Sequence, residues 1–182
     1  MGCGPPCSRI DGAERRVPLF PQPPVKRGRD GRFEITLSDI ERRLLRTYLE
    51  QLRDLLLSDD PLLKRLFPPA YLQDPDHDED YQRLMKGELI ESRFSAIEVM
   101  EGTLDERYVD EPALTRWMQA INSLRLVLGT RLDVSEMPEP PDRDDPDFGL
   151  RVLYEQLGWM LGFIVEALTA ALPEPTDDGP EI

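Results

Sequence analysis

The stretch that decides the fold is WMQAINSLRLVLGTRL, residues 117–132. Together with the residues before it, this stretch places apolar side chains at alternating spacings of three and four: Leu114, Trp117, Ile121, Leu124 and Leu128. This spacing is typical of a helix that packs along another helix. Asp110, Glu111 and Pro112 mark its start, because proline is favoured in the first helical turn. We therefore predict a helix over about 111–130, with Gly129 suited to a left-handed cap near its end.

Working outward, the sequence on the N-terminal side predicts three more helices. Ser38-Asp39-Ile40-Glu41 is a capping box. It opens a helix over about 38–57 whose apolar face is expected to consist of Ile40, Leu44, Tyr48, Leu52 and Leu55. A short helix over 61–67 begins with Pro61 after Asp60 and ends at Pro68-Pro69. After an acidic loop (Asp74 to Asp80), a further helix is expected over about 80–101.

On the C-terminal side, residues 133–147 form an acidic, proline-rich linker. The helix that follows, over about 147–172, is apolar nearly all round, so we expect it to be the central and most buried element, with Trp159 inside the core. Near the N-terminus, Asp30-Gly31 is a hairpin-turn dipeptide, and Phe33 and Ile35 alternate with polar residues. These features predict a small β-hairpin over about 25–36.

These elements predict an all-α fold: a compact bundle of four long helices and one short helix, with a small N-terminal β-hairpin and disordered termini. A chain of 182 residues fits one domain with tails, here placed at 25–172. Residues 1–24 are expected to be a disordered leader that contains cysteine and proline, and residues 173–182 an acidic disordered tail.

Charge is distributed unevenly along the chain. Residues 1–32 carry seven Lys or Arg and three Asp or Glu, whereas the rest of the chain carries 15 basic and 33 acidic residues. A body this acidic repels DNA and anionic membranes, so we expect no independent sequence-specific DNA binding and no membrane association. The longest uncharged apolar run, residues 157–165, is about half of what a bilayer needs, and no signal peptide is evident. A cytoplasmic protein is predicted.

The sequence contains no recognisable catalytic or cofactor motif. His77 is the single histidine, and neither phosphate-binding glycine motif is present. Asp74-x-Asp76-x-Asp78 begins like a calcium loop, but Glu79 and Met85 stand where glycine and glutamate are required. We therefore expect a protein that is not an enzyme and has no cofactor, and that works by binding partners.

Five segments in order resemble an actinobacterial family of oxidative-stress regulators (AosR-like, formerly catalogued as a domain of unknown function). They are Gly-Arg-Phe (31–33), Leu-Ser-x-x-Glu (37–41), Arg-Leu-Phe-Pro-Pro-Ala-Tyr (65–71), residues 117–132, and Leu-Tyr-Glu-Gln-Leu-Gly-Trp-Met (153–160). The resemblance covers roughly residues 25–172. Its matching residues are largely of core and helix-surface type, so they indicate a fold more directly than an activity.

The resemblance implies a thiol switch, in which a disulfide across a C-x3-C motif forms under oxidation and the oxidised regulator associates with a sigma factor. Cys3 and Cys7 have that spacing and are the only cysteines. A disulfide between them requires the segment to turn, because an extended chain would hold the two residues too far apart. Arg9, Arg15 and Arg16 would favour the reactive thiolate and are candidate contacts between this N-terminal arm and a partner.

Two alternatives to the thiol switch stay open. Cys3 and Cys7 can equally be incidental thiols in a leader, or ligands of an incomplete zinc site that would need further donors. The protein would then be a constitutive interaction adaptor without redox function, conceivably linked to Clp-type proteolysis.

Overall fold

The computed structural model describes residues 22–28, 30–68, 75–134 and 143–170, for 75–84 the backbone only. The described elements are, in order, β1 (Val25–Arg27), β2 (Phe33–Ile35), α1 (Asp39–Leu56), the 3-10 helix η1 (Pro61–Arg65), α2 (Pro75–Thr103), β3 (Tyr108–Val109), α3 (Glu111–Arg131) and α4 (Phe148–Thr169). The mostly helical fold with a small N-terminal hairpin is thereby confirmed.

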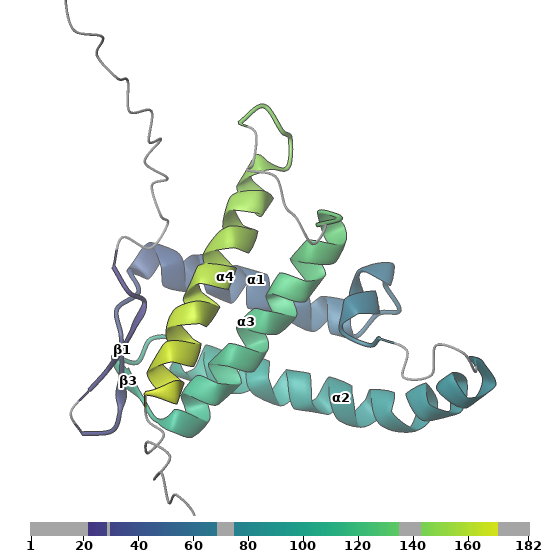
Figure 1. Cartoon of the computed structure of the whole chain (residues 1–182), viewed down its shortest axis with the longest axis horizontal. Helices are drawn as coiled ribbons and strands as arrows, with labels where there is room; N and C mark the ends of the chain where they lie inside the picture. Colours follow the sequence, from purple (N-terminus) through teal and green to yellow (C-terminus); the bar gives the residue numbers. More distant parts are fainter. Residues whose placement is uncertain (1–21, 29, 69–74, 135–142, 171–182) are drawn as a thin grey trace, which may run out of the picture.

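The four α-helices form two antiparallel pairs that cross each other. In Figure 1, α1 and α2 run across the view in opposite directions, and α3 and α4 run steeply across them, also in opposite directions. Helix α3 contacts α1, α2, α4 and η1, so it joins the two pairs. The small sheet lies at one end of this assembly, where β1 packs against α4.

Helix α3 is the most buried element. The predicted seam of Leu114, Trp117, Ile121, Leu124 and Leu128 is buried throughout, which confirms the reading of residues 117–132. Trp117 is 0% exposed, and its indole Nε1 donates a hydrogen bond to Thr103 Oγ1 at 2.8 Å. Since an indole N–H is costly to bury without an acceptor, this bond fixes α3 against the end of α2.

The expectation that the last helix would be the central one is wrong. Helix α4 buries one narrow face, spaced by three and four residues, against its neighbours: Leu153, Leu157, Met160, Ile164 and Ala167. Trp159, predicted to be inside the core, is only partly buried, and Val165 is 48% exposed. Helix α4 also carries apolar residues outside this face, and its contacts with α3 and β1 do not cover them completely.

In α1 the capping box is confirmed, but the buried face is shifted by about one residue. The Ser38 side chain accepts from the Glu41 amide, and the Glu41 carboxylate accepts from the Ser38 amide. The fully buried apolar residues are Leu45, Leu49, Leu52 and Leu56, whereas Ile40 is 69% exposed. Leucines occur in adjacent pairs in this helix, so two neighbouring faces have the same helical spacing.

Three other boundaries differ from the prediction. The short helix is of the 3-10 type and is capped by Asp60, which accepts from the Leu62 amide at 2.8 Å. Helix α2 begins at Pro75, so most of the acidic segment predicted to be a loop is helical. A proline can begin this helix because proline is tolerated in a first turn. The left-handed residue after α3 is Asp133 (φ 46°), while Gly129 lies within the helix.

The predicted hairpin belongs to a three-stranded antiparallel sheet. Val25 pairs with Ile35 and Arg27 with Phe33, and Gly31 adopts a positive φ of 79° in the turn. The third strand, β3, pairs with β2 through Phe33 and Val109, and it was not predicted. The buried side chains of the three-stranded sheet extend the helical core: Val25, Phe33, Ile35 and Val109.

Arg42 ties the sheet to the helices through main-chain carbonyls. Its Nε donates to Leu37 O at 3.1 Å and its Nη2 to Ile35 O at 3.4 Å, both in the segment that leads into α1. Its Nη1 donates to the carbonyls of Leu104 and Glu106, in the connection from α2 to β3. One guanidinium therefore satisfies acceptors from two segments more than 60 residues apart in sequence.

The burial of α3 predicts a stability contrast between the two tryptophans. Trp117→Ala should lower the free energy of unfolding by about 3–5 kcal/mol, because it removes a fully buried ring and leaves a cavity. Trp159→Ala, at a partly buried position, should cost clearly less. Urea denaturation followed by circular dichroism measures both. Equal losses would contradict the assignment of α3 as the core helix.

The Arg42 contacts predict a second contrast. Arg42→Lys should lower the free energy of unfolding by about 1–3 kcal/mol, because an ammonium cannot satisfy carbonyls in both segments. Arg43→Lys, at the exposed neighbouring position, is the matched control and should be close to neutral. Thermal or urea unfolding distinguishes the two, and a neutral Arg42→Lys would show that these bonds contribute little.

Candidate functional site

The residues predicted to form the redox site and its arm lie outside the described residues: Cys3, Cys7, Arg9, Arg15 and Arg16. The disulfide and the arm contacts therefore stay predictions. His77 lies in α2, and its side chain is likewise outside the described part. Among the side chains that the structure describes, no group of three or more His, Cys, Asp or Glu could hold a metal ion.

The structure does show where the leader joins the body. The first described residues are held to the segment between β2 and α1: Thr36 donates its amide to Pro24 O at 3.0 Å and its hydroxyl to Pro23 O. The Arg27 guanidinium donates to the carbonyl of Ala170, just beyond α4. The leader therefore joins the body beside the start of α1, whereas the C-terminal turns of α4 lie next to the far end of β1 (Figure 1).

Those turns of α4 carry apolar side chains that the core leaves partly or largely exposed. Trp159 and Phe163 meet edge to face, with ring centroids 4.6 Å apart and an interplanar angle of 76°. Leu161 is partly buried, and Val165 is 48% exposed. Trp159 and Phe163 lie on one side of the buried face of α4, and Leu161 and Val165 lie on the other, because residues two apart on a helix do not face the same way. We call these four residues together the α4 strip. Grouped apolar and aromatic side chains at a surface are typical of sites that bind other proteins.

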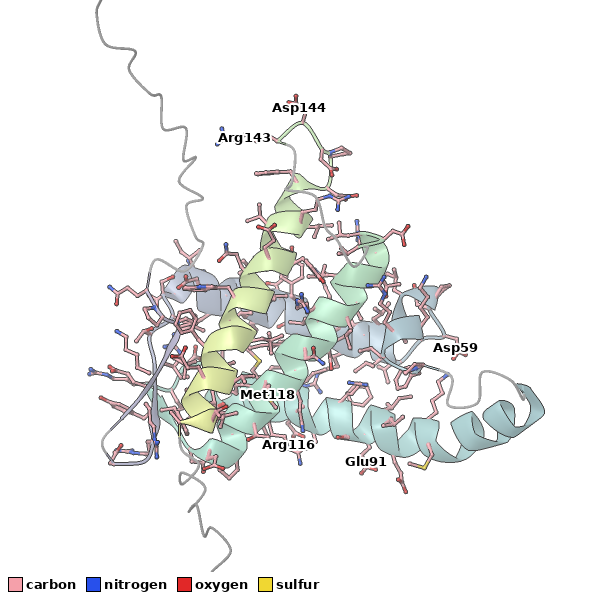
Figure 2. All side chains as sticks on the ribbon, in the orientation of Figure 1. Asp59, Glu91, Arg116, Met118, Arg143 and Asp144 are labelled. Atoms are coloured by element: carbon pink, nitrogen blue, oxygen red, sulfur yellow. The ribbon has the colours of Figure 1, made fainter. Side chains whose placement is uncertain are left out.

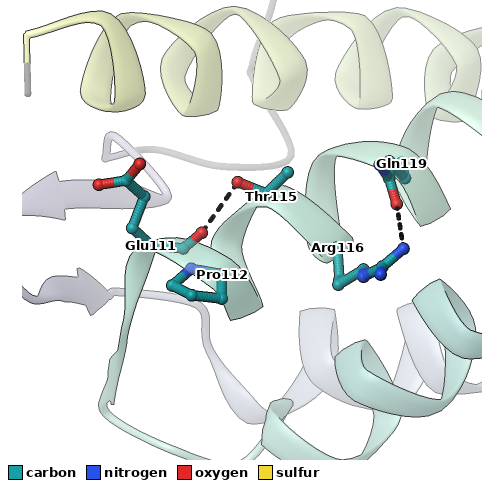
Figure 3. A pocket seen from close by; sticks show the side chains of 5 residues that line it. All are labelled: Glu111, Pro112, Thr115, Arg116 and Gln119. Carbon is teal, nitrogen blue, oxygen red and sulfur yellow. Dashed lines mark hydrogen bonds between the residues drawn. The ribbon is translucent and has the colours of Figure 1, made fainter. Parts of the chain in front are cut away.

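A shallow hollow of about 520 Å³ lies over the first two turns of α3, lined by Glu111, Pro112, Thr115, Arg116 and Gln119 (Figure 3). Its polar groups are bonded within their own helix: Thr115 Oγ1 donates to Glu111 O at 2.9 Å, and Arg116 Nη1 donates to Gln119 Oε1 at 3.0 Å. The single carboxylate, Glu111, is exposed. Tuned catalytic carboxyls are usually shielded from solvent, so we do not assign a reaction to this hollow.

Ion pairs connect separate elements at the surface. Lys86 Nζ lies 2.8 Å from Asp59 Oδ1, which joins α2 to the turn before η1 and lowers the pKa of the Asp59 carboxyl. Asp59 lies at the η1 end of the molecule, far from Arg143 and Asp144 at the start of α4 (Figure 2). Exposed pairs of this kind contribute little individually, so they position side chains more than they stabilise the fold.

Near the start of α4, Asp145 accepts from the Asp147 amide at 2.8 Å and from Arg151 Nε at 2.6 Å. The amide hydrogen bond, and after it the Arg151 side chain, lowers the pKa of Asp145. Asp145 therefore stays ionised into the acidic range and holds the segment that leads into α4.

Arg93 is a partly buried cation that sequence patterns did not single out. Its Nη2 donates to Leu66 O at 2.8 Å and its Nη1 to Ser123 Oγ at 3.0 Å, and its guanidinium lies 5.5 Å from the centroid of Phe67. Burial lowers the pKa of Arg93. Both terminal nitrogens are bonded within the fold, so Arg93 connects α2, α3 and the end of η1 as a structural residue.

No helix in the described part of the chain is both long and apolar enough to cross a membrane. No curated protein and no solved structure matches the chain. One family model matches residues 22–168, and its description is a domain of unknown function, DUF2017. That match includes every described helix and strand except the last residue of α4, and it begins where the leader joins the body. The chain therefore belongs to the DUF2017 family.

Proposed function

We propose that this protein is a redox-responsive regulator that binds a protein partner, a sigma factor, when oxidant links Cys3 to Cys7. The spacing of the two cysteines and the resemblance to the oxidative-stress regulators support the chemistry. The observation that carries the proposal in the fold is the α4 strip, a set of partly or largely exposed apolar side chains on the helix that packs against β1, the first strand after the leader. Such side chains suit contact with a protein partner.

The chemistry of the switch requires only an oxidant of the peroxide class. One thiolate attacks a peroxide oxygen and becomes a sulfenic acid, while the second peroxide oxygen leaves as hydroxide and is protonated. The other thiol then attacks the sulfenic sulfur, which releases water and closes the disulfide. The two thiols lose two electrons in total, and hydrogen peroxide becomes two water molecules. Arginines in the arm favour the thiolate that starts this sequence.

Partner binding through protein contacts is consistent with the charge of the chain. The body after residue 32 carries 33 acidic and 15 basic residues, so it repels nucleic acid on its own. An effect on transcription therefore acts through a protein partner. Arg9, Arg15 and Arg16 would supply the basic contacts to that partner, and the α4 strip the apolar ones.

A constitutive adaptor, conceivably linked to Clp-type proteolysis, is the second candidate. The α4 strip favours it to the same degree, since these side chains are partly or largely exposed in the helical body and the strip contains no cysteine. The two candidates differ in one measurable property: whether partner binding depends on oxidant.

The proposal predicts the behaviour of serine variants. In a pull-down with a purified sigma factor, the wild type should bind after peroxide and release the partner after dithiothreitol. Cys3→Ser and Cys7→Ser should each abolish the intramolecular disulfide, seen as a lost shift on a non-reducing gel, together with the oxidant-dependent binding. The melting temperature should stay almost unchanged, because neither cysteine belongs to the described core.

Val165→Asp is the companion variant, since it places a charge on the α4 strip at an exposed position that should not unfold the protein. It should weaken partner binding while the disulfide still forms. Oxidant-dependent binding that persists in both serine variants would refute the thiol switch. Binding that ignores oxidant but is lost in Val165→Asp would identify the constitutive adaptor instead.

A further inference from the structure

Arg125, in α3, differs from the other partly buried arginines described above. Arg42 and Arg93 donate to carbonyl and hydroxyl acceptors within the fold. The Nε atoms of Arg93 and Arg125 are both buried without a hydrogen-bond partner, but both terminal nitrogens of Arg93 are bonded, whereas no described acceptor or carboxylate pairs with Arg125. Because an unpaired buried donor is costly, its position calls for an explanation.

Helix α4 provides a fitted place for this guanidinium. Arg125 Cζ lies 4.6 Å from the centroid of the Tyr154 ring, close enough for a cation–π interaction. One turn later, Gly158 leaves the space that the side chain occupies: a Cβ atom there would lie 3.1 Å from Arg125 Nε and 3.6 Å from Cζ. Tyr154 and Gly158 therefore form a slot on α4 that fixes Arg125 in one orientation.

A second guanidinium reaches the same tyrosine from η1. A Cβ atom on Gly129 would lie 3.0 Å from Arg65 Nη1 and 3.2 Å from Tyr154 Cε2, so both side chains pack over this glycine. Arg65 Nη2 donates to Val134 O at 3.0 Å, just after α3, which fixes the side chain. Three elements thus bring two positive charges to one aromatic ring.

The electrostatics of this arrangement favour an anion. Two guanidiniums that flank one tyrosine repel each other, and a negative charge bound beside them would offset that repulsion. The described ion pairs that neutralise basic side chains in this acidic chain use other residues: Arg32, Arg46, Arg53, Lys86, Arg107 and Arg151. A fixed pair of guanidinium forks matches the geometry of phosphate oxygens, which accept two parallel hydrogen bonds from one arginine.

We propose that Arg65 and Arg125, arranged around Tyr154 at the junction of η1, α3 and α4, bind an oxyanion of the phosphate class. The ligand is inorganic phosphate or the phosphate group of a small nucleotide. This site is independent of the thiols and of the α4 strip, so it stands or falls separately from the proposed function.

The test is titration of the full chain with inorganic phosphate at constant ionic strength, followed by calorimetry and thermal unfolding. The wild type should bind and its melting temperature should rise with phosphate concentration. Arg125→Met and Arg65→Met should each weaken the affinity by about tenfold or more, the usual effect of losing a charge-assisted hydrogen bond. Arg116→Met, on the same helix but outside the site, is the control and should bind as the wild type does.

Gly158→Ala tests the geometry without removing a charge. Its methyl group would displace Arg125 from the slot, so phosphate affinity should fall by about tenfold even though both arginines remain. Gly162→Ala, one turn further along α4, meets nothing within 4 Å and should retain wild-type affinity. If Gly158→Ala does not fold, the two methionine variants decide the outcome.

Adenosine monophosphate as a second titrant separates the two sources of the phosphate group. Equal affinity for both ligands assigns the site to the phosphate group alone, and tighter binding of the nucleotide assigns it to a nucleotide. A wild type that shows no stabilisation by either ligand beyond that of matched sodium chloride would overturn the proposal. Unchanged phosphate affinity in both methionine variants would overturn it as well.

Discussion

The burial of Trp117 is the constraint on which the other elements depend. This side chain is 0% exposed, and its only polar group is satisfied by Thr103 at the end of α2. The bond sets the height of α3 against α2, and α3 in turn contacts α1, α4 and η1. A shift of α3 by one turn would remove the acceptor from the indole and leave it buried without a partner, at a cost of about 1–3 kcal/mol. The position of α3 therefore determines where the other helices can pack.

The sequence could predict α3 because its apolar residues form one series with helical spacing and no competing series beside it. In α1, by contrast, Leu44 and Leu45, and again Leu55 and Leu56, form adjacent pairs that place two apolar faces side by side. The choice between these faces depends on which one meets α2 and α3, and periodicity does not contain that information. Strand β3 was not predicted, for a related reason. Two residues have no periodic pattern, and only their pairing with β2 makes them a strand.

The candidate sites differ in the same respect: one is visible in the local sequence, and the others depend on contacts between distant segments. The thiol pair is a local feature, visible as two cysteines four positions apart, and it stays a prediction because it lies outside the described residues. The roles of Arg42, Arg93 and Arg125 depend on acceptors and rings from distant segments, so no local pattern could find them. The helical glycines offered one signal. Glycine inside a helix costs about 1 kcal/mol relative to alanine, so Gly129 and Gly158 within strongly helical stretches indicate close packing. The signal does not single out these two places, because a Cβ atom on the helical residues Gly87, Gly102 and Gly162 would meet nothing within 4 Å.

Arginine suits this acidic body for a physical reason. A guanidinium is planar and less strongly hydrated than an ammonium, and it donates in fixed directions, so it can be partly buried against carbonyls and aromatic rings. Arg42 uses this property to hold the end of β2 to the connection from α2 to β3. Thr36 holds the last leader residue, Pro24, next to the end of β2, and Arg27 holds the end of β1 to the carbonyl of Ala170 after α4. Several hydrogen bonds hold the corner where the leader joins the body. A disulfide in the leader would therefore not displace this corner. If the proposed disulfide forms, it would change the shape of the arm ahead of this corner, and the helical body would remain a fixed platform.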